Sequence, residues 1–218
     1  MYIYENELSD SDIINFVKTY HRNILNSKNH RIHRFKELIK TNSTLLDFGC
    51  GWGCNSYELS KKGVYVTGID ISDNEVNISK LVWGENEFLK FYNYNITDID
   101  SNKYDYVLSA EVIEHVHNVG SYLSHINRVL KTNGTLVIST PNIFTIPNIL
   151  SVFSFNKKKQ LQILSEEINM NYQKGHHHIN TWDPVHFTRL LSSVGFTFKS
   201  YHTEGIIPLP VIMNKKLS

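Results

Sequence analysis

The first forty residues of the chain place apolar side chains at helical spacing. Residues 10–26 carry Ile13, Val17, Tyr20 and Ile24 about one helical turn apart, with polar residues between them. Residues 31–40 repeat the same period. The pattern predicts two helices, and we expect residues 1–42 to form an N-terminal helical cap.

Between residues 43 and 140, short apolar runs alternate with amphipathic stretches. The runs have the length of strands, and the stretches between them have the length and period of crossover helices. We expect strands at residues 44–48, 65–69, 88–94, 104–109 and 134–139, and helices at 55–62, 74–82 and 119–130. This order is typical of a mainly parallel sheet with helices on both faces, so residues 43–140 are the predicted core.

The alternation stops after residue 140. Residues 141–178 contain two helical stretches, at 146–153 and 158–172, and we expect them to form a helical insertion, or lid, over the site. Residues 179–218 then supply a closing helix at 184–193 and two strands at 197–202 and 207–213. The chain is therefore predicted to be a single α/β domain of residues 1–218: a doubly wound, Rossmann-like seven-stranded sheet with N-terminal helices and a helical insertion after strand 5.

Composition narrows the partners of this domain. A formal net charge of +1 gives no global field that would attract a polyanion. No run of eighteen apolar residues is present, and no basic segment followed by an apolar stretch begins the chain, so we expect a cytoplasmic protein without stable membrane insertion. Cys50 and Cys54 lie beside a glycine-rich turn and are expected to be reduced packing residues. A homodimer through the N-terminal helices is an arrangement that the sequence leaves open.

A glycine-rich turn follows the first predicted strand. The run from Leu45 to Gly53 places Asp47 at the strand end and glycines at alternate positions after it, and Asp70 ends the next strand about twenty residues later. Glycine lets the backbone approach a ligand closely, and the next helix presents its free N–H groups. A dinucleotide-binding turn is the alternative, but it requires a glycine where this chain has Cys54 and does not require Asp47.

This turn resembles motif I of the class I S-adenosylmethionine-dependent methyltransferases. The resemblance covers residues 44–140, and it implies that Asp70 binds the ribose and that Asn95 and Ile96 contact the adenine, with Asn95 where the family usually has an acid. It also places Ala110, at the end of the fourth strand, beside the methyl-bearing sulfur. The implied cofactor-binding residues are Asp47, Gly49, Cys50, Gly51, Trp52, Asp70, Ile71, Asn95, Ile96 and Ala110.

Candidate acceptor chemistry follows the fourth strand in Glu111, Glu114 and His115. On a helix, positions i, i+3 and i+4 share one face, so these side chains would converge and suit a cation such as Mg²⁺ or Mn²⁺. The pattern resembles the small-RNA 3′-terminal 2′-O-methyltransferases, whose Glu-x-x-Glu-His set is completed by a histidine four residues before a tryptophan. By that resemblance the fourth ligand is His178, from the run His176, His177 and His178. The ubiquinone-biosynthesis O-methyltransferases are similar too, and they also carry an arginine upstream of motif I, to which Arg31 is similar.

Two chemistries stay open for this segment. With a metal, Glu111, Glu114, His115 and His178 hold a cation that lowers the pKa of the acceptor hydroxyl. Without one, His115 or a histidine of the triplet is the general base. We expect O-methylation of a hydroxyl group, and we expect the acceptor to be a small molecule or a sugar of a glycan. Methylation of RNA 3′ ends and non-catalytic binding of S-adenosylmethionine are the alternatives, and the absence of a strong basic excess disfavours RNA.

Overall fold

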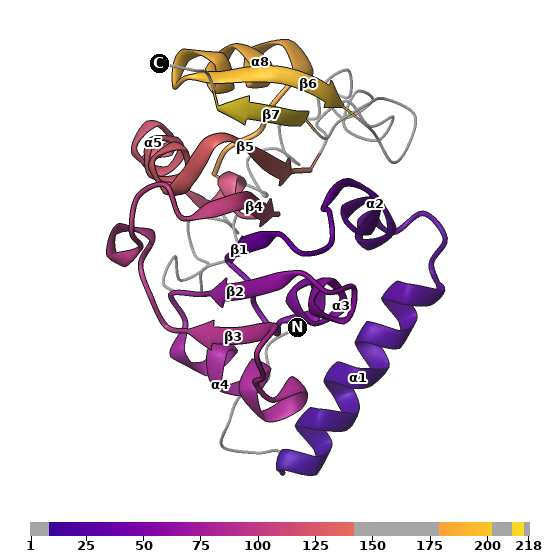
Figure 1. The fold of residues 1–218 in the computed structure, drawn as a ribbon. Helices are drawn as coiled ribbons and strands as arrows, with labels where there is room; N and C mark the ends of the chain where they lie inside the picture. The colour runs from indigo at the N-terminus through magenta and orange to yellow at the C-terminus, as the bar shows by residue number, and fades with distance from the viewer. Residues whose placement is uncertain (1–8, 142–178, 202–210, 216–218) are drawn as a thin grey trace, which may run out of the picture.

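The computed structural model describes residues 9–141, 179–201 and 211–215 of the chain (Figure 1). The predicted insertion helices at 146–153 and 158–172, and His176, His177 and His178, lie outside the described residues. No helix in the described ranges is both long and apolar enough to cross a membrane.

One sheet organises the described chain. Its strand order is β3-β2-β1-β4-β5-β7-β6, with β1 to β5 parallel and β7 antiparallel to both of its neighbours. The α/β Rossmann-like fold predicted from the sequence is thereby confirmed. The strands are β1 Thr44–Phe48, β2 Tyr65–Ile69, β3 Leu89–Tyr92, β4 Tyr104–Ala110, β5 Leu130–Ser139, β6 Phe196–Tyr201 and β7 Val211–Lys215.

Five of the described α-helices begin where a side chain accepts from a free N–H group, whereas Cys54–Lys61 begins after Gly53 without a side-chain cap. Ser9 and Asp12 form a capping box at the start of the first helix, and Asp183 caps the last, with Pro184 in its first turn. The described helices are α1 Asp10–Asn26, α2 Arg31–Leu38, α3 Cys54–Lys61, α4 Asp73–Trp83, α5 Val119–Val129 and α8 Pro184–Ser193, with short 3-10 turns η1 Ile96–Asp98 and η2 Ile113–His115. The two predicted N-terminal helices are therefore present.

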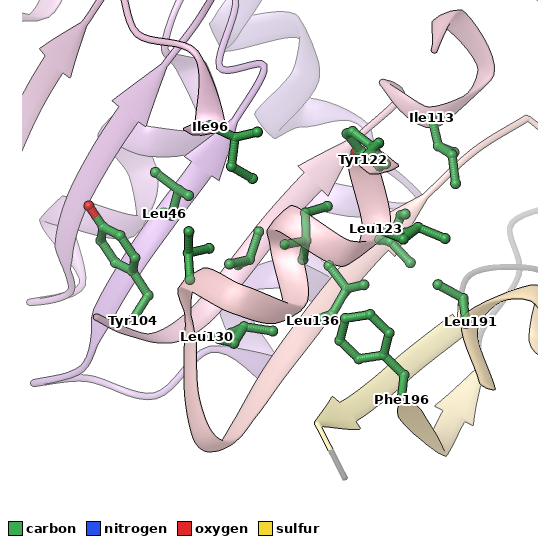
Figure 2. Packing of buried hydrophobic residues seen from close by; sticks show 14 of the residues in the cluster. Leu46, Ile96, Tyr104, Ile113, Tyr122, Leu123, Leu130, Leu136, Leu191 and Phe196 are labelled. Atoms are coloured by element: carbon green, nitrogen blue, oxygen red, sulfur yellow. The ribbon is translucent and has the colours of Figure 1, made fainter. Parts of the chain in front are cut away.

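Two apolar layers cover the sheet, one on each face. Neighbouring residues of β1 point to opposite faces, so that Leu46 joins a cluster with Leu123 of α5 and Leu191 of α8, whereas Leu45 packs with the layer of α2, α3 and α4. Figure 2 shows the first cluster, in which side chains from β5, α5 and β6 interlock. These layers hold the parallel strands rigidly, and the strand ends can therefore carry a site.

The strand order reverses between β1 and β4. From β1 the chain first builds outward through β2 and β3, and then returns to place β4 on the other side of β1. In open α/β sheets the loops at the carboxyl ends of two such strands diverge and leave a ligand crevice. The segments that leave β1 and β4 here are the glycine-rich turn and the loop that begins at Glu111.

Candidate functional site

The glycine-rich turn between β1 and α3 depends on left-handed backbone. Gly49, Gly51 and Gly53 have φ values of 74°, 50° and 72°. The turn is tied to β2, because the N–H groups of Gly49 and Cys50 both donate to the carbonyl of Ile69, over 2.9 and 3.0 Å. The alternate glycines predicted as a ligand turn therefore do adopt the conformation that favours glycine.

Asp47 lies beneath this turn. Its side chain is 1% exposed, and its Oδ2 accepts a hydrogen bond of 2.6 Å from the hydroxyl of Ser56. Burial raises the pKa of Asp47 to about 6, and the negative charge of Asp70 adds to the effect. Asp47 thus supports the turn from below and does not face solvent.

Asp70 is fixed at the end of β2, next to the turn. Its Oδ2 accepts from the N–H of Gly51 at 3.0 Å, and its Oδ1 accepts from the N–H of Ser72 at 2.9 Å. The carboxylate of Glu75, at the start of α4, lies nearby, and burial together with the charge of Asp70 raises its pKa to about 7. This acidic setting suits a ligand that carries hydroxyl groups and positive charge.

Both cysteines near the turn are free, as the sequence predicts. Burial raises the pKa of Cys54 to about 12 and that of Cys50 well above its ordinary value. Their thiols therefore stay protonated at neutral pH and act as packing groups.

Three further residues predicted to bind the cofactor, among them the predicted adenine contacts Asn95 and Ile96, have different environments. Ile71, directly after Asp70, is 80% exposed and is available to cover a ligand. Ile96 is buried in the core cluster below the sheet edge. The amide oxygen of Asn95 caps the turn η1 by accepting from the N–H of Thr97 at 3.2 Å, which occupies part of its accepting capacity.

The loop after β4 contradicts the helix expected for residues 111–115. Glu111 follows Ala110 with a φ of 57°, a left-handed conformation that ends the strand and turns the chain sharply. Only residues 113–115 are helical, in the 3-10 turn η2. The spacing i, i+3, i+4 therefore does not place the three side chains on one helical face.

Tertiary contacts fix Glu111 in this conformation. Its N–H donates to the carbonyl of Ser139 at 3.0 Å, and its Oε1 accepts from the Ser139 hydroxyl at 2.9 Å. The guanidinium of Arg31, from α2, lies 3.7 Å from the same carboxylate oxygen. Glu111 therefore links the N-terminal helices, β5 and the loop after β4.

Glu114 is a fully buried carboxylate. Neither of its oxygens has a hydrogen-bond partner among the described residues, and the same holds for the buried hydroxyl of Thr140. Burial, with the Glu111 charge nearby, raises the pKa of Glu114, and the Nε2 of His115 lies 4.0 Å from its Oε1. An unpartnered buried carboxylate is costly and is a common feature of functional sites.

The segment that follows His178 docks on this loop. The N–H groups of Ile179 and Asn180 donate to the carbonyl of Glu114 over 2.9 and 3.0 Å, and the Asn180 amide donates to Val116 at 2.7 Å. Within residues 9–141, 179–201 and 211–215, no group of three His, Cys, Asp or Glu side chains is placed to hold a metal ion. His178, the predicted fourth ligand, is outside these ranges.

The glycine-rich turn and the loop after β4 are in close contact. A Cβ atom added at Gly49 would lie 2.6 Å from a methyl group of Val112. The sequence reasoning missed several supports of this arrangement, because their partners are distant in sequence: Ser56, Glu75, Ser79, Trp83 and Ser139. The sequence offers a signal only for Ser79, inside the helix predicted for residues 74–82, and for Trp83, four residues later and just beyond the predicted end of that helix.

Comparison with known proteins assigns this geometry to a family. Residues 20–201 match a family described as a methyltransferase domain. The ubiquinone biosynthesis O-methyltransferase of Pelagibacter ubique is 32% identical over 103 residues, 46% of this chain and 43% of that protein. The protein of the same name from Rickettsia conorii is 36% identical over 100 residues, 45% of this chain and 35% of that protein. The matched segments thus span less than half of these relatives.

Solved structures share the fold at lower identity. A TehB-like S-adenosylmethionine-dependent methyltransferase from Corynebacterium glutamicum superposes with a TM-score of 0.61 at 17% identity, over 95% of this chain and 100% of that one. A methyltransferase from Methanosarcina mazei gives a TM-score of 0.65 at 18% identity, over 85% and 98% of the two chains. At these identities the similarity establishes the fold alone.

Proposed function

The chain belongs to the class I S-adenosylmethionine-dependent methyltransferases, and we propose that it methylates a hydroxyl group of a small-molecule or sugar acceptor. One observation carries the proposal. The glycine-rich turn, where we place the methyl donor, packs through Gly49 against Val112 of the loop that holds Glu111, Glu114 and His115. A methyl group bound above β1 would therefore lie next to acidic and imidazole side chains. Such groups suit an acceptor that must lose a proton.

The reaction needs little activation of the donor. The S–CH₃ bond of the sulfonium breaks as the O–CH₃ bond forms, and the sulfur keeps the electron pair and becomes a neutral thioether. The acceptor hydroxyl loses its proton to a base. We propose His115 and His178 as the candidate bases and Glu111 as the group that orients the acceptor. His115 supports this role because its side chain is 28% exposed beside a buried acid.

The donor chemistry of this loop also fits a divalent cation. Glu114 has two buried oxygens without hydrogen-bond partners among the described residues, and carboxylates with imidazoles suit Mg²⁺ or Mn²⁺. Glu111, Glu114, His115 and His178 would hold the ion, which when bound lowers the pKa of a coordinated hydroxyl. The docking of Ile179 and Asn180 on Glu114 supports including His178, since the chain next to it reaches this loop.

RNA 3′ ends are a second acceptor class. A terminal ribose offers the same neighbouring hydroxyls as a sugar or a catechol. The tryptophan of the RNA-methyltransferase pattern is Trp182, four residues after His178, and it packs against Phe187 with ring centroids 5.7 Å apart. A net charge of +1 provides little general attraction for phosphates, so RNA ranks below a small acceptor.

The first experiment is calorimetric titration of S-adenosylmethionine into chelator-treated protein, followed by methyl-transfer assays on diols, catechols, monohydroxyl compounds and RNA 3′ ends. Glu114→Ala is the test variant, and Glu37→Ala is the control, because Glu37 forms an exposed ion pair with Arg34 on α2. We expect Glu114→Ala to bind the cofactor as wild type does and to lose at least about 100-fold in turnover.

The outcomes separate the versions of the proposal. Mg²⁺ or Mn²⁺ binding that disappears in Glu114→Ala supports the metal site, whereas full activity in chelator assigns proton removal to a histidine. Cofactor binding without turnover on any acceptor supports the non-catalytic alternative. Absence of cofactor binding would overturn the proposal.

A further inference from the structure

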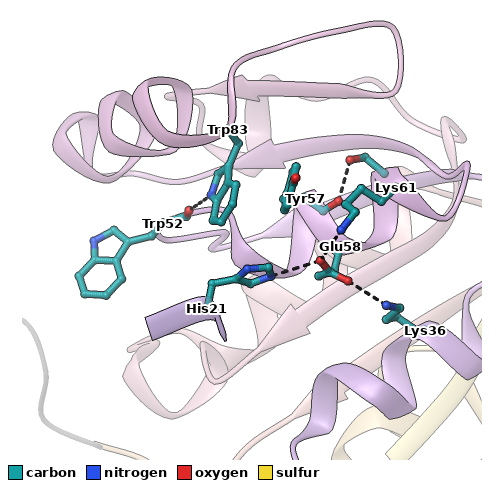
Figure 3. A network of polar contacts seen from close by, with 8 residues as sticks. His21, Lys36, Trp52, Tyr57, Glu58, Lys61 and Trp83 are labelled. Atoms are coloured by element: carbon teal, nitrogen blue, oxygen red, sulfur yellow. Dashed lines mark hydrogen bonds and ion pairs between the residues drawn. The ribbon is translucent and has the colours of Figure 1, made fainter. Parts of the chain in front are cut away.

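Two side chains of α4 hold consecutive carbonyl groups of the glycine-rich turn. The Ser79 hydroxyl donates to the carbonyl of Gly51 over 2.7 Å, and the Glu75 carbonyl of its own helix is a second, longer acceptor at 2.9 Å. The indole N–H of Trp83 donates to the carbonyl of Trp52 over 2.6 Å (Figure 3). Ser79 and Trp83 are four residues apart, so one face of α4 supplies both bonds.

These bonds fix the orientation of two peptide planes. No peptide bond described in the chain is cis, so each N–H points away from the carbonyl of its own peptide unit. The N–H of Gly53 is turned back and donates to the Cys50 carbonyl at 2.9 Å. The N–H of Trp52 shares a peptide unit with the Gly51 carbonyl that Ser79 holds, and it therefore points away from α4.

Packing holds the Trp83 ring in place. Its indole stacks on Tyr57 of α3, with centroids 4.2 Å apart and planes inclined by 18°, and His21 of α1 meets it edge-on at 4.9 Å. Figure 3 shows the three rings together. The buried carboxylate of Glu58 lies 3.4 Å from His21 Nε2 and pairs with Lys36 at 2.8 Å, and burial lowers the pKa of His21. The indole N–H of Trp83 is thus held in place by ring contacts from two other helices, α3 and α1.

We propose that Ser79 and Trp83 are positioning residues for the methyl donor, holding the turn so that the N–H of Trp52 binds the carboxylate at the amino-acid end of S-adenosylmethionine. Backbone N–H groups of glycine-rich turns bind anions, and this carboxylate is the only anionic group of the cofactor. The inference rests on the proposed function, because it requires that cofactor.

The test measures, by calorimetry, the affinity of the full 218-residue chain for two ligands. S-adenosylhomocysteine has the carboxylate, and 5′-methylthioadenosine has the adenosine and the thioether sulfur but no amino acid. The variants are Trp83→Phe, which keeps the stacked ring, and Ser79→Ala. Ser60→Ala is the matched control, since among the described residues its buried hydroxyl donates only to the Tyr57 carbonyl within α3, at 2.8 Å.

We expect each of Trp83→Phe and Ser79→Ala to weaken S-adenosylhomocysteine binding about five-fold, the effect of losing one neutral hydrogen bond, and the double variant to weaken it further. Binding of 5′-methylthioadenosine should change less than about two-fold, and Ser60→Ala should bind both ligands as wild type does. Equal weakening for both ligands would show a purely structural role and overturn the inference, as would unchanged binding of both. Failure of the wild type to bind S-adenosylhomocysteine would instead overturn the proposed function.

Discussion

The contact between the donor turn and the loop after β4 predicts a specific cost for a side chain at Gly49. An alanine there would have its Cβ 2.6 Å from Val112 Cγ2, at a residue whose φ is 74°. The left-handed backbone costs a non-glycine residue about 1 kcal/mol, and relief of the overlap adds about 1–3 kcal/mol. We therefore expect Gly49→Ala to lower the free energy of unfolding by about 2–4 kcal/mol, measured by urea denaturation followed by circular dichroism.

Two variants separate the backbone and contact contributions. Gly63 has a φ of 82° with nothing within 4 Å of an added Cβ, so Gly63→Ala should show the backbone cost alone, about 1 kcal/mol. In a Val112→Ala background the methyl groups that would clash are gone, and Gly49→Ala should then cost about as much as Gly63→Ala. A clash with Val112 is refuted as the cause if Gly49→Ala costs no more than Gly63→Ala, or if Val112→Ala gives no relief in the double-mutant cycle.

Two further predictions concern buried titratable groups. The pKa of folded Asp47 is about 6 in place of 3.8, so its contribution to stability is complete below pH 4 and is lost as the pH rises to about 6. Asp47→Asn should remove this loss, which is on the order of 3 kcal/mol, and so raise the free energy of unfolding at pH 8. The measurement is urea denaturation of both proteins at pH 4 and pH 8. The same pH dependence in wild type and variant would contradict the prediction. With pKa values of about 12 for Cys54 and well above the ordinary value for Cys50, neither thiol should react with iodoacetamide in folded protein at pH 8. Mass spectrometry that found either cysteine alkylated before unfolding would contradict this assignment.

The fold was predictable because its signals are local. The apolar periods that predict strands 44–48 and 65–69 and the two N-terminal helices correspond to elements of the structure. Boundaries were less accurate where two elements meet directly. The sequence pattern predicts residue 130 as the end of a helix, whereas in the structure it begins β5, because the pairing of Leu130 with Tyr104 extends that strand.

The geometry after β4 was not predictable from spacing. The helix expected for residues 111–115 assumed right-handed backbone, whereas Glu111 is left-handed in the structure. Nothing in the residue type of a glutamate indicates this conformation. It is held by two hydrogen bonds with Ser139, which is 28 residues away: the Glu111 N–H donates to the Ser139 carbonyl, and the Ser139 hydroxyl donates to the Glu111 carboxylate. Similarly, the spacing of residues does not indicate that the hydroxyl of Ser56 is the partner of Asp47. The contribution of that hydrogen bond to stability depends on the burial of both groups, which only the folded structure shows.

The N-terminal helices contact both sides of the proposed reaction site. On the donor side, Phe16 and Tyr20 of α1 meet the Trp52 ring edge-on, with centroids 5.6 and 5.5 Å apart. On the acceptor side, Arg31 of α2 lies 3.7 Å from Glu111. Figure 1 shows these helices following one another along one side of the sheet. Because one helical pair touches the donor turn and the acceptor loop, a change in its packing alters both at once, and variants in α1 should affect cofactor and acceptor affinities together.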